Sequence, residues 1–169
     1  MTGPVFVDTN VFLYARDSRD PAKQQRALEW LGYLWQRHLG RTGTQVLSEY
    51  YVNLTRKLSP RIDPEDAWEE VRLLFAWGPQ PVDEAVLHGA REIERRWRLA
   101  WWDSMVVAAA QLQGCALLLS EDLQDGAKYG GVDVRSPFTL TIEESRARYQ
   151  AAPRAERHRP RGRPRRKGG

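Results

Sequence analysis

The stretch Val5-Phe6-Val7-Asp8-Thr9-Asn10, near the start of the chain, decides the fold. Three consecutive apolar residues predict a short strand that is buried on both faces, as in a parallel sheet covered by helices. The strand ends at Asp8, and a short helix is predicted over residues 10–16. Ligands of open α/β sheets bind beyond the carboxyl ends of the strands. Asp8 is therefore expected at a ligand site.

The rest of the chain alternates between helix and strand patterns. Helices are predicted after Asp20, Asp63 and Asp83, where an N-cap residue precedes apolar residues at three- and four-residue spacing, and over residues 49–58 and 105–112. Strands are predicted at residues 44–47, 116–119 and 132–134. This alternation predicts an α/β fold with a central parallel sheet flanked by helices.

Three more acidic residues lie at the ends of these elements. Glu49 is expected in the first turn of its helix, Asp103 just ahead of an apolar helix, and Asp122 just after a buried strand. Carboxylates that are crowded together repel each other unless a cation shares them. Oxygen ligands favour Mg²⁺ or Mn²⁺ over Zn²⁺. Together with Asp8, these acids point to metal-assisted chemistry on a phosphate ester.

Each acid also has a plainer interpretation. Asp8 can be a turn residue, as an Asp after a strand often is. Asp122 can be one as well, because Asp125-Gly126 nearby is itself a turn signal. Asp103 can be a helix cap, and Glu49 a solvated helix residue. The four side chains indicate a site only when they are taken together.

The net charge of +4 hides two opposite segments. Residues 146–169 contain ten Lys or Arg and one acid, whereas residues 1–145 contain 16 Lys or Arg and 21 Asp or Glu. We predict an acidic folded domain over residues 1–145 and a basic disordered tail over residues 146–169. No apolar stretch is long enough to span a membrane, and no signal peptide is recognisable. With a single cysteine, Cys115, the protein is expected in the reducing cytoplasm.

The local strings around the four acids resemble the PIN-domain family, and within it the ribonuclease toxins of VapBC toxin–antitoxin pairs. In order, they are Val5-Phe6-Val7-Asp8-Thr9-Asn10, Leu47-Ser48-Glu49-Tyr50, Trp102-Asp103-Ser104 and Leu117-Leu118-Leu119-Ser120-Glu121-Asp122. The resemblance covers residues 4 to about 140. It implies a Rossmann-like sheet and an endoribonuclease site that depends on Mg²⁺ or Mn²⁺.

The resemblance also implies roles for individual residues. Asp8 and Asp103 would contact the principal metal, Glu49 would orient or deprotonate the attacking water, and Asp122 would complete the metal shell or hold a second ion. Asn10 would orient Asp8 or bind a metal-bound water. Asp125 is interpreted as a turn residue rather than as a further carboxylate of the site.

An acidic domain must still bind RNA, and two basic segments are candidates. Arg95, Arg96 and Arg98 precede Trp101-Trp102, so that arginines could bind phosphates while tryptophans stack on bases. Alternatively, these arginines are a solvated helix end and the tryptophans belong to the core, which is the interpretation we favour for Trp97. The basic tail either adds salt-dependent RNA affinity or only keeps the protein soluble.

The sequence also has to be weighed against two other functions. A haloacid dehalogenase-type phosphatase would need a second Asp two positions after Asp8, where this chain has Asn10. A catalytically idle module that binds nucleic acid or a partner protein would have no reason to keep four mutually repelling acids. For a toxin, the resemblance implies a cognate antitoxin and a possible homodimer. No membrane partner is expected.

Overall fold

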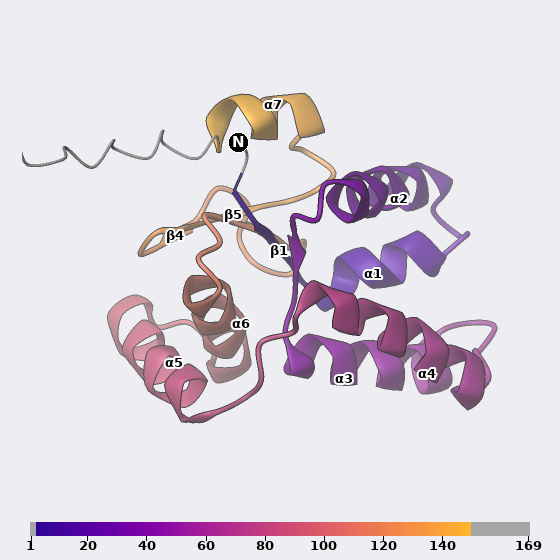
Figure 1. The fold of residues 1–169 in the computed structure, drawn as a ribbon, viewed down its shortest axis with the longest axis horizontal. Coiled ribbons are helices and arrows are strands. Elements are labelled where there is room, and N and C mark those ends of the chain that lie inside the picture. The colour runs from indigo at the N-terminus through magenta and orange to yellow at the C-terminus, as the bar shows by residue number, and fades with distance from the viewer. Residues whose placement is uncertain (1–2, 150–169) are drawn as a thin grey trace, which may run out of the picture.

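The computed structural model describes residues 3–149 (Figure 1). A five-stranded sheet with the order β2-β1-β3-β5-β4 lies at the centre. Its strands are β1 (Val5–Val7), β2 (Gly40–Arg41), β3 (Leu117–Leu119), β4 (Lys128–Tyr129) and β5 (Val132–Arg135). The first four strands in this order are parallel, and only β4 pairs antiparallel, with β5. The predicted α/β fold with a central parallel sheet is confirmed, with a short antiparallel strand added at one edge.

Helices flank the sheet (Figure 1). They are α1 (Thr9–Arg16), α2 (Pro21–Gln36), α3 (Thr44–Val52), the π-helix η1 (Asn53–Lys57), α4 (Pro64–Leu73), the 3-10 helix η2 (Leu74–Trp77), α5 (Glu84–Trp97), α6 (Trp101–Leu112) and α7 (Ile142–Arg148). Helix α1 packs on α2, and α5 packs along α6 (Figure 1). In residues 3–149, no helix is long and apolar enough to cross a membrane.

The core explains why β1 and β3 carry no alternating pattern. Strands β1 and β3 are buried at every position, because helices cover both faces of the sheet. Their register pairs Val7 with Leu119. The residues that follow, Asp8 and Ser120, therefore lie side by side at the carboxyl end of the sheet. Asp8 N donates a hydrogen bond to Leu119 O at 3.0 Å.

The predicted strand at residues 44–47 is wrong, because this segment forms the first turns of α3. Short apolar runs do not distinguish strand from helix by themselves. Here the buried residues Val46, Leu47, Tyr50 and Leu54 follow helical spacing along one face. The strand that pairs with β1 lies earlier, at Gly40–Arg41. At Gly40 a Cβ atom would lie 2.5 Å from the Trp77 ring, so glycine allows the close approach there.

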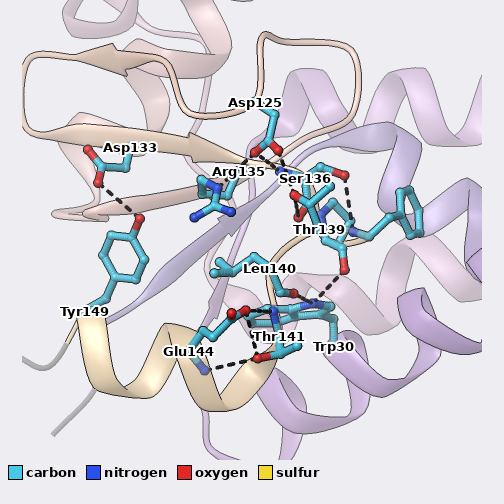
Figure 2. Close-up of polar contacts among 12 residues, drawn as sticks. Trp30, Asp125, Asp133, Arg135, Ser136, Thr139, Leu140, Thr141, Glu144 and Tyr149 are labelled. Atoms are coloured by element: carbon cyan, nitrogen blue, oxygen red, sulfur yellow. Dashed lines mark hydrogen bonds and ion pairs between the residues drawn. The ribbon is translucent and has the colours of Figure 1, made fainter.

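The predicted domain boundary at residue 145 is too early, because α7 continues to Arg148. A capping box starts this helix, with reciprocal hydrogen bonds between Thr141 and Glu144 (Figure 2). Tyr149 then packs against the core, and its hydroxyl lies 3.1 Å from Asp133 Oδ2 (Figure 2). The charge count concealed the end of this helix because its last turn carries Arg146 and Arg148, which were counted with the basic tail. The rest of the predicted tail, residues 150–169, lies outside the described residues.

Candidate functional site

Asp8 connects β1 to α1 and is nearly buried, with 7% of its surface exposed. It is the N-cap of α1, and its Oδ1 accepts a hydrogen bond from Thr9 N at 2.8 Å. Its Oδ2 accepts a second from Ser120 Oγ at 2.8 Å. Burial raises the pKa of Asp8 to about 6; these two hydrogen bonds oppose the rise, and the charges of Asp122 and Glu49 add to it.

Asn10 hydrogen-bonds this carboxylate and the loop after β3. Its Nδ2 donates to Asp8 Oδ2 at 3.4 Å and to Ser120 Oγ at 3.3 Å. Its Oδ1 accepts a hydrogen bond from Glu121 N at 3.1 Å, which ties the loop after β3 to α1. Sequence reasoning missed Ser120. The signal that could have found it was its position, one small polar residue beyond a buried strand that neighbours β1.

Glu49 reaches the same edge of the sheet from α3. It lies in the middle of that helix and not in the first turn as predicted, because the helix starts at Thr44. Thr9 Oγ1 donates to its Oε2 at 2.9 Å, and Gln45 Nε2 donates to its Oε1 at 3.1 Å. Both carboxylate oxygens are therefore held, and the plainer interpretation of a solvated helix residue does not fit. Sequence reasoning also missed Thr9 and Gln45, although Gln45 lies one helical turn before Glu49.

Asp103 lies in the first turn of α6 and does not cap it, since the N-cap residue is Ala100. The helix dipole favours a negative charge at this position. Even so, burial raises the pKa of Asp103, and the charges of Asp122 and Glu49 raise it further. The charges that act on this carboxylate are thus those of two other acids.

Asp122 is exposed, in the loop that follows β3. Its charge raises the pKa of both Asp8 and Asp103, and so does the charge of Glu49. The four predicted acids come from four separate segments and act electrostatically on a common space at the carboxyl end of the sheet. The structure thus brings together the carboxylates that the sequence analysis singled out.

The donors at this site suit a hydrated divalent ion. Within residues 3–149, no three His, Cys, Asp or Glu side chains lie close enough together to hold one metal ion directly. Mg²⁺, however, usually keeps several waters and binds one or two carboxylates directly. The ligands are all oxygens, and a cation would lower the raised pKa values of Asp8 and Asp103. Such a set fits Mg²⁺ or Mn²⁺ held partly through water.

Asp125 does not join the four acids. Its Oδ1 accepts hydrogen bonds from Arg135 Nε and Ser136 N, each at 2.9 Å, and its Oδ2 accepts one from Thr139 Oγ1 at 2.7 Å (Figure 2). It therefore ties the turn before β4 to the segment after β5. The interpretation of Asp125 as a turn residue is confirmed.

The three tryptophans near Asp103 differ in their exposure. Trp97 packs edge-on against Tyr129 at a centroid distance of 5.8 Å, which confirms the core interpretation for this residue. Trp101 is half-buried against the core, whereas Trp102 is 63% exposed. Beside them, Arg95 pairs with Glu92 and Arg96 lies 4.6 Å over the Trp97 ring. Trp102 is thus the one of these three tryptophans that is free to contact a ligand.

Comparisons with known proteins agree with this fold. A family model described as the PIN domain matches residues 5–125. Similar solved structures include a toxin–antitoxin complex from Klebsiella pneumoniae, with 17% identity, a TM-score of 0.56, and 79% of this chain and 97% of that chain covered. Another is DNA-bound VapBC from Salmonella typhimurium, with 13% identity and a TM-score of 0.57. That match covers 80% of this chain and 98% of the other.

A third similar structure is VapC20 from Mycobacterium tuberculosis, described as a toxin that cleaves the sarcin–ricin loop. It is 21% identical, with a TM-score of 0.54, and the match covers 70% of this chain and 91% of that chain. At such identities these structures show the fold that the chain adopts. No curated protein sequence matches the chain.

Proposed function

The chain belongs to the PIN domain family, and from that premise we propose that it is a metal-dependent endoribonuclease, the toxin of a VapBC-type toxin–antitoxin pair. The observation that carries the proposal is that carboxylates from four segments come together, so that two of them act on the other two. Asp122 and Glu49 raise the pKa of both Asp8 and Asp103. Such an arrangement destabilises a fold unless a cation completes it.

In this proposal, Asp8 and Asp103 hold a Mg²⁺ or Mn²⁺ ion, and Asp122 completes its shell or holds a second ion. The metal would neutralise charge on the phosphate and lower the pKa of water. The chain's own contribution is orientation. Asn10 and Ser120 fix one oxygen of Asp8 through hydrogen bonds.

In this proposal, Glu49 would orient or deprotonate the attacking water. Thr9 and Gln45 each donate a hydrogen bond to one of its oxygens, which fixes the direction of the carboxylate. Attack by water does not use the ribose 2′-hydroxyl as nucleophile. The products would carry a 5′-phosphate and a 3′-hydroxyl.

The direct test compares purified wild-type protein with the Asp8→Asn variant on RNA in Mg²⁺ or Mn²⁺. We expect cleavage by the wild type, its loss in the variant, and its loss in excess EDTA. Cleavage that survives EDTA would remove the metal from the mechanism. Calorimetric titration with Mn²⁺ separates this function from an idle binding module, which should bind no Mn²⁺ above background.

The toxin role has its own test in cells. Toxin–antitoxin complexes are among the structures that share this fold, although at less than 25% identity. Expression of the chain should arrest growth, and co-expression of a small protein encoded beside it should relieve the arrest. A stable complex of the two proteins would identify the antitoxin. Size-exclusion chromatography with light scattering would show whether the toxin alone is a homodimer.

A further inference from the structure

A cleft of about 340 Å³ adjoins the acid site, lined on one side by α1 and on the other by η1. Asn10 and Asp122 lie in its wall, together with Tyr14, Asn53 and Lys57. Small-molecule pockets span roughly 300–1,000 Å³, so the space suits about one nucleotide. We infer that the cleft binds the nucleotide next to the scissile phosphate, with Lys57 on a phosphate and Tyr14 against the base. This inference rests on the proposed function.

Lys57 is the cation of this cleft that is available to a ligand. It is exposed, and it takes part in none of the ion pairs between described residues. Arg19, which also lines the cleft, is bound at 2.8 Å by Asp17. A lysine ammonium binds phosphate as a compact point charge. Lys57 is thus placed to hold a phosphate on the opposite side of the cleft from α1.

The backbone of η1 directs Lys57 into the cleft. Leu58 N donates to Asn53 O at 2.8 Å, five residues back, so α3 widens into a π-helix. A π-helical turn rotates the residues that follow it relative to a regular α-helix, and such turns are frequent at functional sites. Glu49 lies one turn earlier on the same continuous helix. The proposed water-orienting acid and the proposed phosphate ligand are therefore parts of one rigid element.

Tyr14 supplies an aromatic surface that neighbouring residues hold in place. Phe138 packs against it edge-on at 5.1 Å, and Lys23 Nζ lies over one face of the ring, 4.7 Å from its centroid, while the ring also lines the cleft. Leu13 and Leu58 add apolar surface to the same cleft. Stacking on a fixed aromatic ring suits any of the four bases, because every base has a π-face.

Asn53 supplies a hydrogen-bond acceptor. Its Nδ2 donates to Glu49 O at 2.7 Å, which fixes the amide and leaves Oδ1 for a ligand. A ribose 2′-hydroxyl or a base amine can donate to such an oxygen. The cleft thus offers the Lys57 ammonium, the Tyr14 ring and the Asn53 amide oxygen, which match the phosphate, base and sugar of a single ribonucleotide.

The first experiment measures the kinetics of cleavage of short dye-labelled oligoribonucleotides of random sequence in Mn²⁺. We expect Lys57→Ala to raise KM about tenfold with little change in kcat, since a phosphate contact outside the reacting atoms contributes to binding. Lys57→Arg should recover most of the loss. Arg56→Ala, the adjacent exposed cation on η1, is the matched control and should retain the wild-type KM.

The outcomes separate this inference from the proposed function. A wild-type protein that does not cleave RNA would overturn both. Wild-type cleavage with an unchanged KM in Lys57→Ala, or an equal rise in Arg56→Ala, would overturn only the cleft. Because Lys57 is exposed, its replacement should leave the thermal unfolding midpoint nearly unchanged, and circular dichroism checks this.

The second experiment tests the base. For a defined oligoribonucleotide that the wild type cleaves, one abasic position next to the cleavage site should raise KM about tenfold. In Tyr14→Leu the same abasic substitution should not raise KM further, whereas in Tyr14→Phe it should raise KM as in the wild type. An equal abasic effect in Tyr14→Leu and in the wild type would overturn the assignment of the base to Tyr14.

Discussion

Asp8 follows β1, and Asp125 lies in the loop after β3, the neighbouring strand. Their environments nevertheless shift the pKa of the two carboxyls in opposite directions. Burial raises the pKa of both carboxyls. For Asp125, hydrogen bonds from Thr139, Ser136 N and Arg135 outweigh burial and leave the pKa below its usual value. For Asp8, the hydrogen bonds do not outweigh burial, and the pKa stays at about 6. One aspartate stabilises the fold, and the other is kept at a cost in stability.

The difference lies in the partners that the chain provides. Asp125 has an arginine at 2.9 Å, whereas the charged groups that act on Asp8 are two further acids. Residues that oppose stability in this way tend to persist where function needs them. The comparison therefore assigns structure to the Asp125 network and chemistry to the Asp8 network, and each assignment can be broken by a matched substitution.

The largest expected difference is in catalysis. Asp103→Asn should lower kcat for RNA cleavage by roughly 100- to 1,000-fold, the usual scale for losing one electrostatic contributor to a transition state. Asp125→Asn, which preserves shape and an acceptor oxygen, should stay within about threefold of the wild type. A steady-state assay in Mn²⁺ makes the comparison. Equal losses in the two variants would end the division between the two networks.

The next effect is the response of stability to metal. An ion that binds only the folded state adds about 2.7 kcal/mol when its concentration is 100-fold above Kd. The unfolding midpoint of the wild type should therefore rise with Mn²⁺, while that of Asp8→Asn should rise much less. Asp125→Asn should respond like the wild type. Differential scanning calorimetry with and without EDTA provides the measurement, and a rise that persists in Asp8→Asn would place the ion elsewhere.

Much of this site could be predicted because its acids stand next to strong local signals. Asp8 and Asp122 follow buried apolar runs, and Asp103 opens an apolar helix, so topology alone brings them to one edge. The residues that hold the acids could not be found in this way. Ser120 reaches Asp8 across 112 positions of the chain, and Thr9 reaches Glu49 across 40. Such contacts depend on strand register and helix packing, which periodicity does not give.

The two errors of fold have a related cause. The helix that carries Glu49 begins five residues earlier than predicted, because an apolar run of four residues fits strand and helix equally well. The sequence analysis ended the folded domain before Arg146, because the excess of Lys and Arg after this point predicted a disordered tail. In the structure Tyr149, beyond those arginines, hydrogen-bonds Asp133 and fastens the helix to β5. The contacts of Tyr149 therefore keep this segment in the folded body although its composition is basic.

A smaller effect is expected in the stability of the Asp125 network. Asp125→Ala removes three hydrogen bonds, each with a typical net value of about 1 kcal/mol, reduced here because the carboxylate is partly exposed. We expect a loss of about 2 kcal/mol and a fall of roughly 4–8 °C in the unfolding midpoint. Urea unfolding in EDTA measures this free energy. A variant as stable as the wild type would remove Asp125 from its structural role.

The smallest effect has the opposite sign. Because the folded-state pKa of Asp8 is about 6, above the usual 3.8, ionising this carboxyl costs the fold free energy, up to about 3 kcal/mol. The stability that the protonated form provides is complete below about pH 4 and is lost as the pH rises through 6. In Asp8→Asn the cost is absent, although the new amide faces Asn10 Nδ2, a second donor, which reduces the gain. In EDTA at about pH 7 the variant should therefore be more stable than the wild type by about 1 kcal/mol.

The pH dependence of that gain distinguishes charge from packing. At about pH 4 the wild-type carboxyl is protonated in the folded protein, so the advantage of Asp8→Asn should vanish there. A gain of equal size at both pH values would mean that the amide merely packs better. A loss of stability at pH 7 would mean that the hydrogen bonds from Thr9 and Ser120 outweigh burial for Asp8, just as those from Thr139, Ser136 and Arg135 do for Asp125. The two aspartates would then be alike. Urea unfolding of both proteins in EDTA across this range measures which of the three holds.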